Sequence, residues 1–213
     1  MTDEQKEKIK SGNEKIISQK GYRVNKGLPY PDNPNLRTID EVKGRISVMT
    51  ALVNISFNAP TPIIKGWIEK HDLQKHLSKW EAEILNKNND ALTDVEINSL
   101  RWSLESLWAL LWVVKKIDNL DAEEHVGDNL ASLVPNLQRG ENNKKIDKLK
   151  NLQPELTIYT MLDYYYRLHW YCVDERLQGR QAALNEGQVY ERRKALEWTF
   201  DRNSDWDDIE MGT

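Results

Sequence analysis

The run that decides the fold is Tyr159–Leu177, YTMLDYYYRLHWYCVDERL, followed closely by Val189–Trp198, VYERRKALEW. Apolar or aromatic residues recur every three or four positions in the first run, which predicts one long helix. The second run predicts a partner helix over about residues 184–200, and an acidic WDD follows it at Trp206–Asp208. Aromatic, arginine and carboxylate side chains are denser here than elsewhere in the chain. A polar site inside the fold is therefore expected first in this region.

Helix-start signals recur through the rest of the chain. A Ser, Thr or Asp followed three residues later by Glu can satisfy free N–H groups at a helix N-terminus. Four such capping boxes occur: Thr38 with Glu41, Ser78 with Glu81, Thr93 with Glu96, and Asp121 with Glu124. No stretch alternates like a strand bounded by hairpin turns. The sequence therefore predicts an all-α, single-domain, multi-helix orthogonal bundle of about seven to nine helices.

The expected organisation has three parts. Residues 1–21 form an N-terminal helix that is partly peripheral, and residues 22–37 form an extended, Pro-rich connector. Residues 38–213 form the helical core, which makes one domain with the preceding parts. Within this core the periodicity predicts helices over about 39–57, 93–116 and 122–133. Lys115 and Lys116 are expected in the last turn of the second of these, where cations suit the helix dipole.

Composition limits the classes of partner. The 213 residues carry a net charge of about −4, whereas nucleic-acid binding needs a basic face, so nucleic acid is an unlikely partner. The segment from Lys144 to Lys150 is locally basic, and contact with nucleic acid through it is a further functional option beside the two hypotheses given below. The single cysteine, Cys172, cannot form an internal disulfide. The polar N-terminal segment is not a signal peptide, and no apolar stretch is long enough to span a membrane, so a cytoplasmic location is expected.

The candidate polar cluster lies on the last two predicted helices and in the tail. It comprises Asp163, Arg167, His169, Arg192, Arg193, Asp207 and Asp208. In one interpretation the arginines bind an anionic substrate and His169 acts as acid or base. In the other, the same side chains form a structural ion-pair network that docks the acidic tail, since a buried guanidinium needs carboxylates or carbonyls around it. No individual catalytic residue is assigned.

Other residues carry weaker signals. His71 and His76 are five residues apart, so they do not share a helix face as in a helical zinc motif, and no metal site is predicted. The three consecutive tyrosines Tyr164–Tyr166 cannot all be buried on one helix, so Tyr164 or Tyr165 is expected at a surface. Glycine-rich phosphate loops, CxxC pairs, GxSxG and HExxH are absent from the sequence, and no cofactor is predicted.

Three motifs carry a family resemblance. They are YRLHW at Tyr166–Trp170, ERRxALxW at Glu191–Trp198 and the closing WDD. With them the chain resembles an uncharacterised, mostly bacterial family that is defined only as a domain of unknown function. The resemblance implies a single domain with its signature polar residues near the C-terminus, and it brings no activity with it.

Two functional hypotheses follow from the sequence. The first is a non-enzymatic, soluble interaction or regulatory protein, with another protein as its expected partner and the oligomeric state left open. The alternative is an enzyme or small-ligand binder for an anionic substrate at the Arg/His/Asp cluster on the last two helices. The absence of catalytic motifs favours the first.

Overall fold

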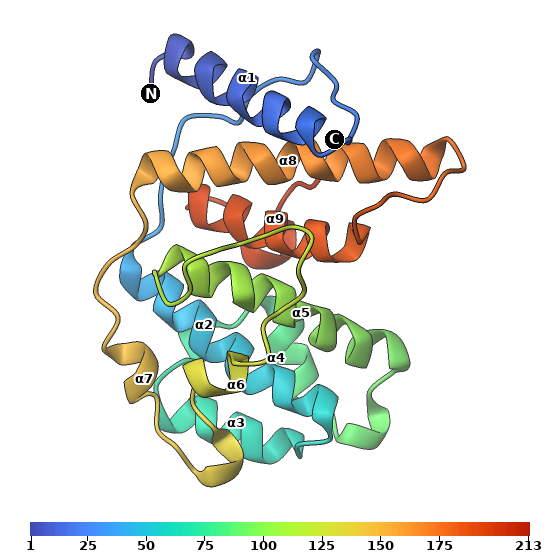
Figure 1. Ribbon diagram of the computed structural model, residues 1–213. Helices are drawn as coiled ribbons and strands as arrows, with labels where there is room; N and C mark the ends of the chain where they lie inside the picture. The colour runs from blue at the N-terminus through green and yellow to red at the C-terminus, as the bar shows by residue number, and fades with distance from the viewer.

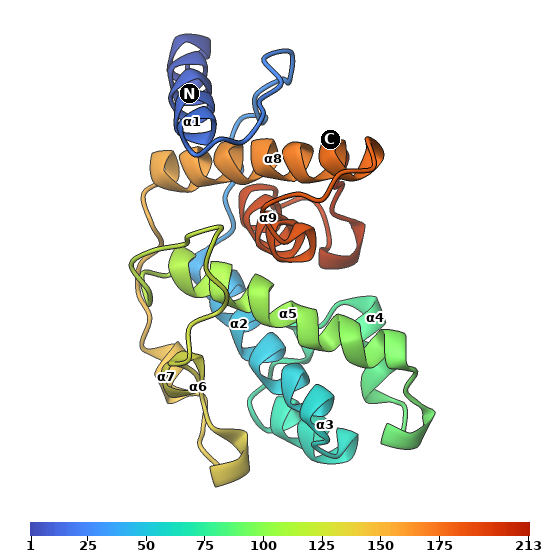
Figure 2. The same ribbon diagram turned by 45° about the vertical axis from the view of Figure 1, so that its right-hand side comes forward.

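The computed structural model describes all 213 residues and is built from helices. Two long helices near the C-terminus, α8 (Glu155–Leu177) and α9 (Glu186–Phe200), pack side by side (Figure 1). On its other side α9 packs against α5 (Asp94–Val113), which in turn contacts α2 (Ile39–Val53) (Figure 2). The only strand-like pairing is a single parallel bridge between Asn35 and Asp201. The prediction of an all-α, multi-helix bundle is confirmed.

The remaining elements surround this stack. The α-helices are α1 (Asp3–Gln19), α3 (Thr61–Lys70), α4 (Lys79–Leu85), α6 (Leu130–Leu133) and α7 (Lys144–Asp147). Short 3₁₀ turns are η1 (Asn54–Phe57), η2 (Gln74–His76), η3 (Asn89–Ala91), η4 (Leu137–Arg139) and η5 (Trp206–Asp208). Helix α1 packs on the face of α8 that is turned away from the rest of the bundle (Figure 1). Residues 22–37 contain no helix.

Capping boxes start three helices as predicted. The hydroxyls of Thr38, Ser78 and Thr93 accept from the backbone N–H three residues further along the chain. In each case the glutamate side chain at that position accepts from the backbone N–H of the Thr or Ser. The fourth prediction is wrong: the Asp121 carboxylate accepts from the Glu123 N–H at 2.9 Å, which closes a turn and starts no helix. The helix predicted over 122–133 shrinks to the single turn α6, because Gly127–Asp128–Asn129 interrupts it. The carbonyls of Asp121, Ala122 and Glu124 accept hydrogen bonds from side chains of α9 in this non-helical segment.

Two further details differ from the sequence-based expectation. Helix α5 ends at Val113, before the two lysines expected in its last turn. Lys115 adopts a left-handed backbone (φ 59°), and the Lys116 N–H donates to the Leu111 carbonyl at 2.8 Å, as in a helix-terminating turn. The helix expected over 39–57 ends as an α-helix at Val53 and tightens into η1, and Phe57 at the end of η1 is exposed.

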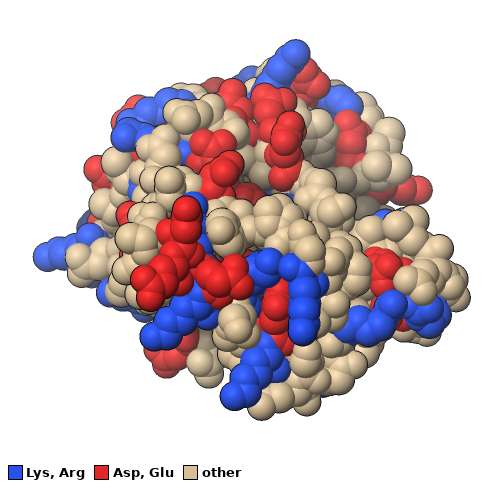
Figure 3. Space-filling model, turned by 90° about the horizontal axis from the view of Figure 1, so that it is seen from above, with Lys and Arg blue, Asp and Glu red and all other residues tan.

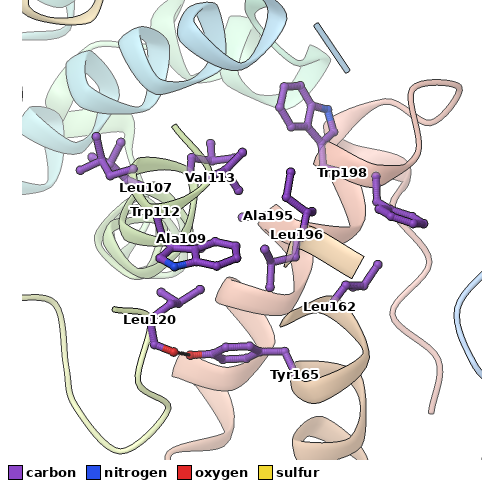
Figure 4. Packing of buried hydrophobic residues seen from close by; sticks show 14 of the residues in the cluster. Leu107, Ala109, Trp112, Val113, Leu120, Leu162, Tyr165, Ala195, Leu196 and Trp198 are labelled. Carbon is purple, nitrogen blue, oxygen red and sulfur yellow. Dashed lines mark hydrogen bonds between the residues drawn. The ribbon is translucent and has the colours of Figure 1, made fainter. Parts of the chain in front are cut away.

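The main core is formed where α5, α8 and α9 meet. Trp112, Leu162 and Leu196 lie between these helices, and Leu107 belongs to the same cluster (Figure 4). Tyr165 is fully buried in this core, and its hydroxyl donates to the Leu120 carbonyl at 3.3 Å (Figure 4). A second, smaller core lies among α2, α3, α4 and α5. Each core buries one flank of α2 and α5, so these two helices connect the halves of the molecule.

The surface carries both signs of charge. On the face formed by α1 and α8, lysine and arginine side chains are interspersed with aspartate and glutamate, and no single sign dominates (Figure 3). None of the helices combines the length and the apolar character needed to cross a membrane.

Candidate functional site

Arg167 joins α8 to α1. Its guanidinium donates to both oxygens of Asp163 one turn earlier, at 2.9 and 2.7 Å. Asn13 of α1 donates to the same carboxylate at 2.8 Å, and Glu14 pairs with Arg167 at 3.2 Å. The Pro29 carbonyl accepts a further bond from Arg167 at 3.3 Å. Both ends of this buried pair are therefore engaged within the protein, as a buried ion pair requires.

Arg192 joins α9 to α5. Its side chain has no exposed surface, and it pairs with the Glu105 carboxylate at 2.7–2.8 Å. It also donates to the carbonyls of Asp121 and Glu124 in the non-helical segment, and to the Tyr165 hydroxyl at 3.2 Å. This network fastens α5, α8, α9 and the 121–124 turn together around a single cation.

Arg193 and His169 hold the tail. The guanidinium of Arg193 donates to His169 Nδ1 at 2.8 Å, so the neutral ring carries its proton on Nε2. It also donates to the carbonyls of Met211 and Gly212, at 3.2 and 3.1 Å. Burial and the neighbouring Arg193 lower the pKa of His169 to about 4. His169 is thus a neutral, buried hydrogen-bond acceptor at neutral pH.

The helical geometry separates these groups. Arg167 and His169 are two residues apart on α8, so they point about 200° apart, one toward α1 and the other toward α9. Arg192 and Arg193 diverge by about 100°, one toward α5 and the other toward the tail. Neither Arg167 nor Arg192 lines any of the four main cavities. The structure does not bring the predicted cluster into one site.

The two tail aspartates lie elsewhere. The Asp207 carboxylate accepts the Trp80 N–H at 2.9 Å in the first turn of α4, and Asp208 is exposed at a smaller cavity of about 310 Å³. Between α4 and α9, the Trp206 ring lies under the Arg45 guanidinium, 4.4 Å from the ring centroid. The WDD turn therefore docks on α2 and α4, while backbone carbonyls further along the tail reach Arg193.

A pocket that sequence reasoning missed lies beside the WDD turn. It has a volume of about 590 Å³, within the range of small-molecule sites, and α2, α4, α5, α9 and η5 all contribute to its wall. The apolar part of the lining includes Met49, Leu52 and Leu100, where the two hydrophobic cores meet, and these three are almost fully buried. Glu191 and Lys194 of α9 also line the cavity. We call this cavity the α9 pocket.

Lys194 is the half-buried cation of this pocket, and it has no anionic partner. Its Nζ lies 5.0 Å from the centroid of the Trp206 ring and forms neither a hydrogen bond nor an ion pair with another side chain. Burial lowers its pKa. Glu191, one turn earlier, accepts from the Ser106 hydroxyl at 2.7 Å, and burial raises its pKa. Two oppositely charged groups thus face one cavity without pairing with each other.

The other candidate residues have ordinary environments. His71 packs on the Trp67 ring, 4.5 Å between centroids, and no group of three or more His, Cys, Asp or Glu side chains is arranged to hold a metal ion. Burial raises the pKa of the Cys172 thiol to about 12, so it stays protonated. Of the tyrosine pair, Tyr165 is buried and Tyr164 is half-buried at a separate, mostly apolar cavity.

The chain was compared with protein families, curated proteins and solved structures. No curated protein and no solved structure matches it. One family matches, and it covers residues 9–209, which include every helix except the first turns of α1. The motifs YRLHW, ERRxALxW and WDD all lie inside that range. The chain belongs to the family described as the domain of unknown function DUF4272.

Proposed function

We propose that this is a non-enzymatic binding protein and that its ligand occupies the α9 pocket. The observation that carries the proposal is Lys194, a half-buried cation that lines a cavity of about 590 Å³ with only the Trp206 ring beside it and no anionic or hydrogen-bonding partner. A charge removed from water needs compensation, and an anionic ligand group would supply it. The aromatic and apolar residues of the lining would hold the remainder of a small molecule, as such pockets do.

The Arg/His/Asp cluster supports the alternative function less well. Its arginines already donate to carboxylates and carbonyls of the protein. An anionic substrate would therefore have to displace internal partners before it could bind. His169 uses Nδ1 to accept from Arg193, and that bond would have to break before the ring could take a proton there. The contrast favours a structural role for the cluster and a binding role for the pocket.

A fragment screen tests the proposal. A set of small acids, amines, amino acids and neutral fragments would be screened against the full chain by ligand-observed NMR. The screen would be repeated on Ser103→Trp, which fills the pocket from α5, and on Ser132→Trp, which adds the same side chain at an exposed site on α6. We expect hits on the unmodified protein that persist in the α6 variant and disappear in the Ser103 variant.

Two results would contradict the proposal. One is the absence of any hit on the unmodified protein. The other is a set of hits that Ser103→Trp leaves unchanged, which would place binding outside the α9 pocket. Thermal unfolding of both variants shows whether each remains folded during the screen.

A further inference from the structure

We infer that the α9 pocket recognises a zwitterion, specifically a free amino acid with a large apolar side chain, through Lys194 and Glu191. The inference rests on the proposed function and names its ligand. Lys194 would bind the ligand carboxylate, and Glu191 would accept from the ligand ammonium. The apolar wall would take the side chain.

Six charged side chains line the pocket: Lys79, Glu81, Glu83, Glu191, Lys194 and Asp207. Glu81 also lines the cavity, but it pairs with the buried Arg45 of α2. Asp207 accepts the Trp80 N–H, so it is engaged at the start of α4. Glu191 has only the Ser106 hydroxyl as a side-chain partner, and Lys194 has no hydrogen-bonded or charged partner. Lys79 and Glu83 of α4 also have no side-chain partner, but both are exposed to bulk solvent. The half-buried cation and anion that a ligand can reach are therefore both on α9.

The spacing of these two groups selects the charge pattern of the ligand. Residues three apart on a helix have Cβ atoms about 5–6 Å apart and project from the same side. Glu191 and Lys194 form no ion pair across this gap, although each influences the titration of the other. A ligand with carboxylate and ammonium on one carbon atom can contact both. A simple anion would be attracted to Lys194 but repelled by the Glu191 carboxylate. A simple cation would be attracted to Glu191 but repelled by Lys194.

The remaining walls select the side chain. The half-buried rings of Trp80 and Tyr190 line the pocket and offer aromatic surface to a ligand. Met49, Leu52 and Leu100 complete the apolar lining and are themselves almost fully buried. The volume of about 590 Å³ exceeds what the amino and carboxyl groups need, which leaves room for a bulky apolar substituent. Burying such a substituent contributes in proportion to its apolar area, so large side chains should bind more tightly than alanine.

Isothermal titration calorimetry on the full chain tests the inference. The probes are L-phenylalanine, L-leucine and L-methionine, with L-alanine as the small comparison. N-acetyl-L-phenylalanine lacks the ammonium, and L-phenylalaninamide lacks the carboxylate. We expect a large amino acid to bind, and each blocked form to bind about tenfold more weakly or worse, because a charged hydrogen-bond partner is lost.

Two variants connect each ligand group to its residue. Lys194→Met should weaken L-phenylalanine about tenfold or more, yet change L-phenylalaninamide little, since the amide has no carboxylate to lose. Glu191→Gln should weaken L-phenylalanine but change the N-acetyl form little. The exposed Lys150→Met and Glu155→Gln serve as charge-matched controls and should leave affinity unchanged.

The outcomes separate this inference from the function on which it rests. If the fragment screen yields hits that depend on Ser103 but none of the large amino acids binds, the zwitterion inference is overturned and the pocket remains a binding site. Amino-acid binding that neither Lys194→Met nor Glu191→Gln weakens also overturns it. A screen without hits rejects both proposals together.

Discussion

The buried arginines and Lys194 lie on the same two helices but use their charge in opposite ways. Arg167, Arg192 and Arg193 each meet carboxylates or carbonyls from at least two segments of the chain. Lys194 is the immediate neighbour of Arg193 in sequence, yet it lines a cavity without an anionic or hydrogen-bonding partner. A guanidinium presents five donors in a fixed plane and can join several segments at once, whereas the lysine ammonium is a compact charge on a flexible stem. Charge density alone therefore does not distinguish a binding site from a structural network.

The largest effect should come from breaking the Arg192 network. Arg192→Met leaves Glu105 buried without its cation and frees the carbonyls of Asp121 and Glu124. We expect the free energy of unfolding to fall by about 3–5 kcal/mol, as for other buried pairs that lose one partner. Guanidinium denaturation followed by circular dichroism measures it.

A double variant sharpens this prediction. Arg192→Met combined with Glu105→Leu removes both charges, so part of the lost stability should return, because no uncompensated carboxylate remains. A loss below about 1 kcal/mol in the single variant would show that Arg192 does not hold the helices together.

The second effect is a pH dependence that originates at His169. Its folded-state pKa of about 4 lies below the ordinary value of 6.5, so between these values the unfolded chain binds a proton that the folded chain does not. Stability from this group is fully present above about pH 6.5 and is lost as the pH falls toward 4. We expect a decrease of about 2–3 kcal/mol across that window, measured by denaturation at a series of pH values.

His169→Asn provides the comparison, because the Asn Oδ1 can accept from Arg193 in place of Nδ1 and does not titrate. Other carboxylates titrate near the acid end of the window in both proteins, so the quantity that matters is the difference between the two pH profiles. Parallel profiles would refute the assignment to His169.

The smallest effect should come from Lys194→Met. Lys194→Met removes no hydrogen bond or ion pair and loses only the contact with the Trp206 ring, so we expect the free energy of unfolding to change by no more than about 1 kcal/mol. The measurement is the same denaturation curve used for Arg192→Met. A destabilisation comparable to that of Arg192→Met would mean that Lys194, like Arg192, has a structural role.

Local signals predicted much of the fold. The long C-terminal helices and three capping boxes depend on neighbours within one or two turns, and the structure shows them where the sequence indicated. The helix expected over 122–133 does not form before residue 130, because Gly127 disfavours it and side chains distant in the sequence bind the carbonyls of this segment. Arg192 and Gln188 of α9 bind the carbonyls of that segment, and nothing within the segment reveals them.

The candidate site was less predictable. We predicted one cluster because these charged residues are close together in the sequence: Arg167, His169, Arg192 and Arg193. Their side chains point in different directions around α8 and α9, so they belong to separate hydrogen-bond networks. In the sequence Lys194 cannot be told from an ordinary surface lysine, because its distinguishing property is the absence of an anionic partner in the folded structure. Five elements between residues 49 and 207 form its pocket, so only the tertiary structure could show it.

The pairing of α1 with α8 has a consequence for synthesis. The Asn13–Asp163 hydrogen bond spans 150 positions of the chain. At about 5–20 residues per second, α1 therefore leaves the ribosome on the order of ten to thirty seconds before its partner does. During that interval the face of α1 that carries Asn13 and Ile17 has no helix to cover it. The exposed face of a growing chain is then mostly polar, because Ile9, Ile16 and Ile17 are the only large apolar residues of α1.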